Sequence, residues 1–146
     1  MKQRDPMRAW VWSSLALQAA GWVFDVLWHG VLSPGVEPRT VPDMVRHLAT
    51  VHLPLYLGAA SVLAATGTLL ARRASGKAPV VAFIGALLSA GAEAWHAYEH
   101  LQLDTHSGPI AGTLSFIGFL IVLGAMWRDR RRQRQAADAI AGRRAA

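Results

Sequence analysis

Four long apolar stretches constrain this chain more than any other feature of its sequence. They cover about residues 9–32, 47–71, 78–101 and 109–127. Each is close to the roughly 20 residues that a helix needs to cross the hydrocarbon layer of a membrane. Because a backbone in lipid must satisfy its own hydrogen bonds, spans of this length are expected to be helices. The sequence therefore predicts an all-α integral membrane protein, a four-transmembrane-helix bundle.

The ends of these stretches set the expected domain organisation. The first stretch does not resemble a signal peptide, because it is too long, contains Asp25 and His29, and precedes no small-residue cleavage site. Residues 1–127 are expected to form one transmembrane domain, and the proline-rich 33–46 loop is expected to be non-helical over most of its length. Residues 128–146 are expected to be a basic tail that extends the fourth helix briefly and then becomes disordered.

The basic residues indicate which way the chain crosses the membrane. The net charge is +6, and of 15 Lys and Arg residues all but two lie in three segments: before the first stretch, between the second and third, and after the fourth. A four-span topology brings these segments to one side, and the positive-inside rule makes that side cytoplasmic, with both termini inside. We therefore expect a multi-pass protein of the cell membrane. Its basic tail is typical of contact with anionic lipid, and no nucleic-acid partner is expected.

The opposite side of the predicted bundle collects histidine and carboxylate side chains. The six histidines of the chain all fall there: His29, His47, His52, His96, His100 and His106. Six of the nine acidic residues accompany them: Asp25, Glu37, Asp43, Glu93, Glu99 and Asp104. The chain is thus polarised, with basic residues at the cytoplasmic side and a His/carboxylate cluster near the extracytoplasmic face.

Depth and helical spacing select the members of this cluster that are expected to face the bundle interior. The first helix carries a carboxylate and a histidine at i and i+4, and the third carries a carboxylate and two histidines at i, i+3 and i+7. At 1.5 Å per residue, these groups and one histidine of the second helix lie within roughly 12 Å of the outer helix ends. Ionisable groups inside a span usually face the bundle and mark function. The predicted metal ligands are Asp25, His29, His52, Glu93, His96 and His100.

Four more side chains are expected around the mouth of the site, where they support it or control access. On an α-helix His47 lies about 140° round from His52, so we expect it to face away from the ligands. Tyr56 shares the face of His52. Asp104 and His106 belong to the short loop after the third span, which can bring them over the site.

The donor atoms limit the metal. Imidazole with carboxylate suits zinc, iron, manganese or Cu(II), and the absence of cysteine excludes thiolate sites. Glu93 and His96 have the Glu-x-x-His spacing of dinuclear carboxylate sites in helical bundles. Those bundles use two such motifs, whereas this chain has one, with Asp25 and His29 as the counterpart. We expect one or two ions of iron, copper or zinc.

Four functions are compatible with such a site. The leading prediction is an iron- or copper-dependent oxidoreductase, with one or two ions, that acts on a small or lipophilic substrate and uses Asp25 and Glu93 as catalytic carboxylates. A membrane-embedded zinc hydrolase is the first alternative, because three histidines would leave a position for water and a carboxylate could act as base. The second is metal binding, delivery or transport without catalysis.

The fourth function, a b-type haem electron carrier, is the weaker prediction. His52 with His96 or His100 would supply the axial ligands, but haem iron does not use carboxylates such as Asp25 and Glu93. A proton-transfer or structural polar network could gather the same residues without any ion. The lipid bilayer is an expected partner, and both a homo-oligomer and a complex with another membrane protein are compatible with the sequence.

Overall fold

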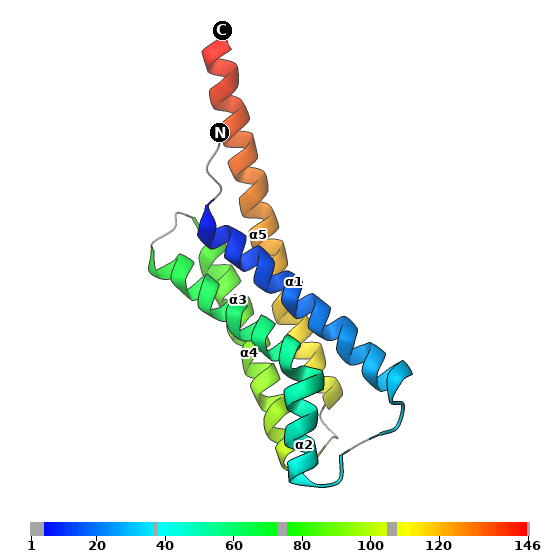
Figure 1. Cartoon of the computed structure of the whole chain (residues 1–146). Coiled ribbons are helices and arrows are strands. Elements are labelled where there is room, and N and C mark those ends of the chain that lie inside the picture. The colour runs from blue at the N-terminus through cyan, green and yellow to red at the C-terminus, as the bar shows by residue number, and fades with distance from the viewer. Residues whose placement is uncertain (1–4, 37, 73–75, 105–107, 146) are drawn as a thin grey trace.

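The computed structural model describes residues 5–36, 38–72, 76–104 and 108–145 (Figure 1). These residues form helices joined by short connections, and they contain no strand. The elements are α1 (Pro6–Leu27), the π-helix η1 (Trp28–Leu32), α2 (Val41–His47), the π-helix η2 (Leu48–His52), α3 (Leu53–Ala71), α4 (Ala78–Leu101) and α5 (Gly108–Ala145).

Four continuous helical segments are long and apolar enough to cross a membrane. They are Pro6–Leu32, Val41–Ala71, Ala78–Leu101 and Gly108–Arg143. An all-helical chain with four candidate spans is therefore confirmed for the described residues. The cytoplasmic location of the termini stays a prediction.

The second segment begins six residues earlier than the hydropathy pattern indicates. The Thr40 side chain caps α2 by accepting a 3.3 Å hydrogen bond from the Asp43 backbone N–H. Pro42 lies in the first turn, where a missing N–H costs nothing. The 33–46 loop is therefore non-helical over most of its described length, as expected, and becomes helical at Val41.

The fourth segment continues well past the end of its apolar stretch. α5 remains helical to Ala145, so the prediction that the basic tail is disordered was wrong for the described part of that tail. Arg, Gln and Ala dominate residues 128–145, and all three are strong helix formers. Figure 1 shows this part of α5 projecting beyond the other helices.

The helices pack as two close pairs. α1 lies along α3, α4 lies along α5, and contacts between α3 and α4 join the pairs. Glycines allow the close approach: Gly21 and Gly58 each face the backbone of the opposite helix in the α1–α3 pair, and Gly85 and Gly118 do so in the α4–α5 pair. A side chain at any of these positions would overlap a neighbouring backbone, as expected for small-residue packing between membrane helices.

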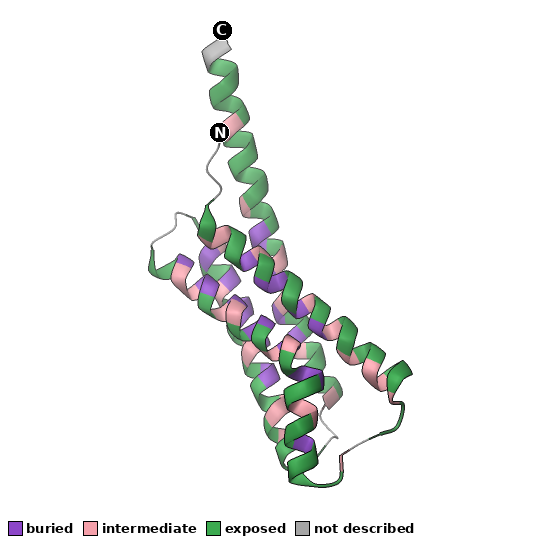
Figure 2. Cartoon of the chain, in the orientation of Figure 1, coloured by how far each residue is buried: buried purple, intermediate pink, exposed green. Residues whose placement is uncertain are grey.

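The apolar core lies nearer one end of the bundle. It includes Val11 and Leu15 from α1, Val62 from α3 and Val122 and Met126 from α5, all buried. Figure 2 shows buried residues along the inner faces of the bundle and exposed residues along the far part of α5. The polar ends beyond this core differ sharply from one another.

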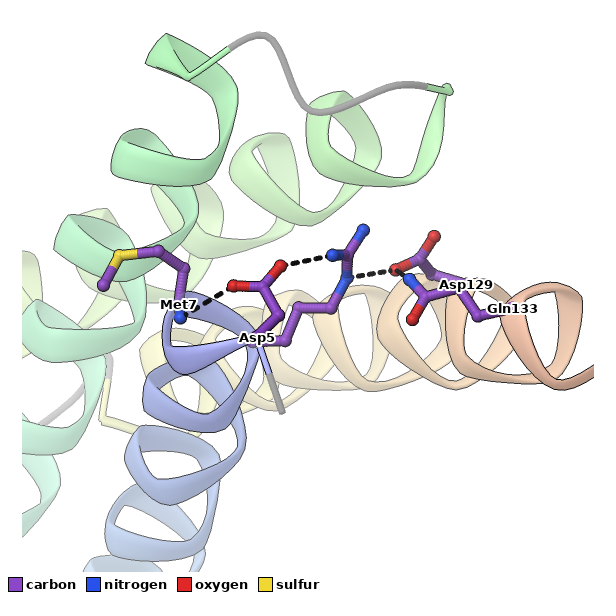
Figure 3. Close-up of polar contacts among 5 residues, drawn as sticks. Asp5, Met7, Asp129 and Gln133 are labelled. Atoms are coloured by element: carbon purple, nitrogen blue, oxygen red, sulfur yellow. Dashed lines mark hydrogen bonds and ion pairs between the residues drawn. The ribbon is translucent and has the colours of Figure 1, made fainter. Parts of the chain in front are cut away.

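We call the end where α1 begins the arginine end, defined by residues 5–13 and 126–134. Arg8 connects two helices there (Figure 3): its Nε donates to Asp129 at 2.8 Å, and its guanidinium also pairs with Asp5. Gln133 donates to Asp129 at 2.7 Å. We call the opposite end, defined by residues 25–29, 47–56 and 93–100, the histidine end.

Candidate metal centre

Two groups of three histidines lie at the histidine end. In each group, one donor nitrogen per residue lies within 4.8 Å of the others. The α1 triad consists of His29, His47 and His52. The α4 triad consists of His52, His96 and His100. His52 is shared, so the two triads are adjacent.

His52 is the centre of this arrangement. Its side chain is buried, and its ring centroid lies 5.6 Å from that of His29 and 5.0 Å from that of His47. The rings of His96 and His100 lie 5.4 Å and 5.3 Å from it. Imidazoles from η1, α2 and α4 therefore surround one imidazole from η2.

The π-helix η2 explains why His47 joins the cluster. It occupies Leu48–His52, between the two histidines. Because π-helical hydrogen bonds join residues five apart, His47 and His52 lie on the same face, whereas an α-helix would separate them by about 140°. The prediction that His47 faces away from the ligands was therefore wrong.

Local sequence accounts for this wide turn. Pro54 has no backbone N–H, and its ring would collide with the carbonyl of Thr50 in a regular α-helix. The Thr50 side chain also bonds to the preceding turn, because its hydroxyl donates to the carbonyls of Arg46, at 2.8 Å, and His47, at 3.2 Å. The helix therefore widens just before Pro54. The other π-helix, η1, contains His29, and η2 contains His52. Both π-helices therefore contribute a histidine to the same cluster.

The two predicted carboxylate ligands occupy different surroundings. Asp25 lies beside the α1 triad, with its Oδ1 2.9 Å from His52 Nδ1 and 3.7 Å from His29 Nε2. Glu93 is buried but belongs to neither triad. Its Oε1 atom is buried without a hydrogen-bond partner among the described residues. The structure therefore brings Asp25 to the histidines and leaves Glu93 outside both triads.

The remaining predicted residues lie at the margin or outside the described residues. The Tyr56 ring stacks on that of His52 with centroids 5.8 Å apart, as its predicted facing requires. Asp104 lies exposed just after α4, where its backbone N–H donates to the carbonyl of Glu99. His106 lies outside the described residues, so its expected position over the site stays a prediction.

Buried polar atoms at the histidine end lack partners. Among the described residues, both ring nitrogens of His52, Nε2 of His47 and Oδ1 of Asp25 are buried without a hydrogen bond. The close contact between Asp25 and His52 does not have hydrogen-bond geometry. Each such group costs about 1–3 kcal/mol when left unsatisfied. A metal cation would use these lone pairs together, so the residues present fit a bound ion.

A hydrogen-bonded chain beneath the cluster was not anticipated from the sequence. The buried Gln18 amide donates to Ser89 at 2.7 Å, and the Ser89 hydroxyl lies 3.1 Å from that of Ser115. The available signal was helical spacing, because Ser89 precedes Glu93 by four residues on the same face of α4. These hydrogen bonds link α1, α4 and α5 just beneath the histidines.

Comparisons with protein-family models, curated proteins and solved structures find no match for this chain. The functional argument therefore depends on the site itself. Within the described residues, the chain combines apolar membrane-length helices with two histidine groups that can hold a metal ion.

Proposed function

We propose that the protein is an integral membrane metalloprotein that binds one or two transition-metal ions at the histidine end and carries out metal-dependent redox chemistry there. The observation that carries the proposal is the pair of triads around His52, several of whose buried donor atoms have no hydrogen-bond partner. A purely structural network would be expected to satisfy such atoms within the protein.

The donor set supports copper in particular. Five imidazoles and one adjacent carboxylate, Asp25, surround the site, whereas Glu93 belongs to neither triad. Imidazole ligands suit copper, zinc and iron, and copper(II) binds most tightly among the divalent first-row metals. Iron sites of the dinuclear bundle type need several carboxylates, which this cluster lacks.

The shared histidine supports two ion positions. An imidazole has two ring nitrogens, so His52 could contribute one to each triad once its ring N–H proton is lost and the ring is an imidazolate. Adjacent copper or iron ions would supply redox chemistry, while the chain would hold them and exclude water. The Asp25 carboxylate, 3.7 Å from the His29 ring, would orient that ring. A small or lipophilic substrate would reach this end from the membrane surface.

A membrane-embedded zinc hydrolase is the second candidate, and one observation favours it. The α4 triad supplies three histidines from two helices, and three protein ligands leave a fourth zinc position for water. Asp25, 2.9 Å from His52, would be the nearby base. Metal delivery without catalysis would use the same ligands.

Metal analysis of the purified full-length chain tests the proposal. The detergent-solubilised protein is stripped with chelator, equilibrated with copper, iron or zinc, desalted and measured by elemental analysis. Retention of one to two copper ions per chain, with a copper EPR signal of nitrogen ligands, is expected. Selective retention of one zinc ion would favour hydrolysis, a Soret band would favour haem, and retention of no metal would overturn the proposal.

A further inference from the structure

A second candidate binding site lies at the arginine end, far from the histidines. A groove of about 640 Å³ separates the first turns of α1 from α5, and its lining includes Arg8, Trp12, Asp129, Arg130 and Arg134. A smaller hollow of about 160 Å³ on α5 is lined by Trp127, Arg130, Arg131 and Arg134. Arg130 and Arg134 line both, so the two hollows meet along one face of α5.

The charges in the groove are not all used within the protein. Arg8 is paired with both Asp5 and Asp129, so its charge is used within the protein and it fixes the groove wall (Figure 3). Within the part of the chain that the structure describes, neither Arg130 nor Arg134 forms an ion pair. These two guanidinium groups can therefore bind an anion from outside.

Tryptophan rings hold neighbouring arginines in place. The guanidinium carbon of Arg130 lies 6.0 Å from the ring centroid of Trp12, and that of Arg131 lies 5.4 Å from the ring of Trp127. Stacking on an aromatic ring orients a guanidinium without occupying its N–H donors. Those donors match the oxygen atoms of a phosphate.

We propose that this groove binds the phosphate headgroup of an anionic phospholipid, with Arg130 and Arg134 as the main contacts. Basic pockets between membrane helices are suited to such headgroups, and tryptophan favours the membrane interface. The site does not depend on the proposed metal chemistry.

Apolar side chains beside the groove favour a lipid over a soluble anion. Trp12, Phe119 and Leu123 are only partly buried where they pack against the core. Trp22 of α1 contacts both Phe116 and Phe119 of α5, with ring centroids 5.0 Å and 5.2 Å apart. An acyl chain attached to a phosphate in the groove would lie against this apolar surface.

The test measures lipid binding to the full chain in detergent by native mass spectrometry and tryptophan fluorescence. The probes are phosphatidylglycerol, phosphatidylcholine and inorganic phosphate. The groove variant is Arg130→Gln with Arg134→Gln. The control, Arg128→Gln with Arg132→Gln, removes the same charge from a different face of α5.

We expect one saturable phosphatidylglycerol site that binds about tenfold more tightly than phosphatidylcholine does. The groove variant should weaken it about tenfold, as loss of charge-assisted hydrogen bonds predicts, and the control by about twofold at most. Equal weakening in both variants would show diffuse surface charge and overturn the proposal. So would inorganic phosphate binding as tightly as the lipid, or no saturable binding. Circular dichroism and metal content check that both variants fold, and metal loss alone leaves this test intact.

Discussion

The arginine end and the histidine end both gather ionisable side chains from distant parts of the sequence, but they satisfy them differently. Arg8 is held between Asp5 and Asp129, and Gln133 donates to the same Asp129 (Figure 3). At the other end, His52 is buried with neither ring nitrogen in a hydrogen bond among the described residues. The first cluster is explained as a link between two helices, whereas the second has buried donor atoms that a metal ion could use.

The backbone is also regular at the arginine end and irregular at the histidine end. Regular α-helix carries the residues of the arginine end, while π-helical turns η1 and η2 carry or adjoin the histidines of the α1 triad. π-Helical turns are rare and are found often at functional sites. The departure from regular geometry therefore coincides with the residues that lack internal partners.

The largest loss of bound metal is expected from His52→Ala, because this residue belongs to both triads. The variant should lose nearly all bound metal, since each triad would retain only two histidines. Elemental analysis after equilibration with copper measures this. Tyr98→Phe, on an exposed part of α4, is the control and should retain full occupancy. Unchanged metal in His52→Ala would leave a structural polar network as the better explanation.

Single histidine variants in each triad are expected to lose part of the bound metal, and they distinguish the two triads. His47→Ala should remove the ion of the α1 triad, and His96→Ala should remove the ion of the α4 triad, so each variant is expected to fall from two ions per chain to one. Titration followed by elemental analysis gives these numbers. If His47→Ala were silent, the α1 triad would not hold an ion. If the double variant His96→Ala with His100→Ala kept all its metal, the α4 triad would not hold an ion.

A smaller change in metal affinity is expected from Glu93→Gln. Glu93 lies outside both triads, and glutamine keeps the size of its side chain and an acceptor oxygen. Metal affinity should change by about twofold at most, against the 10–100-fold typical when a supporting partner of a ligand is lost. Competition with a copper chelator measures it. A loss as large as that of His52→Ala would make Glu93 a ligand, as its spacing to His96 predicts.

The smallest effect is expected at the arginine end, where it concerns stability and not metal binding. Arg8→Ala removes the pairing with Asp5 and Asp129 and should lower the free energy of unfolding by about 1 kcal/mol, the size expected for a partly exposed ion pair. Thermal unfolding in detergent measures this, with the exposed Arg143→Ala as control. Metal content should stay unchanged. A metal loss on Arg8→Ala would contradict the independence of the two ends.

The sequence predicted the parts of this structure that follow regular α-helical geometry. Hydropathy located the four spans, and on the uninterrupted helix α4 the i, i+4 spacing of His96 and His100 placed both in one triad. The same geometry failed for His47, because a proline-induced π-turn intervenes. Span ends were also misplaced, since Thr40 capping and the helix propensity of the arginine-rich segment act outside the apolar stretches.

The π-turn η2 also has a consequence for how such a site can be gained or lost. A π-turn accommodates one residue more than an α-turn, so removing a single codon, such as that of Ala49, would restore an α-helix. α3 and His52 would keep their positions, but α2 and His47 would turn by about 100° relative to them. All six histidines would still be present in the gene product, and one triad would be gone. In a lineage of such proteins, the length of this turn would therefore report the presence of the α1 triad better than a count of histidines.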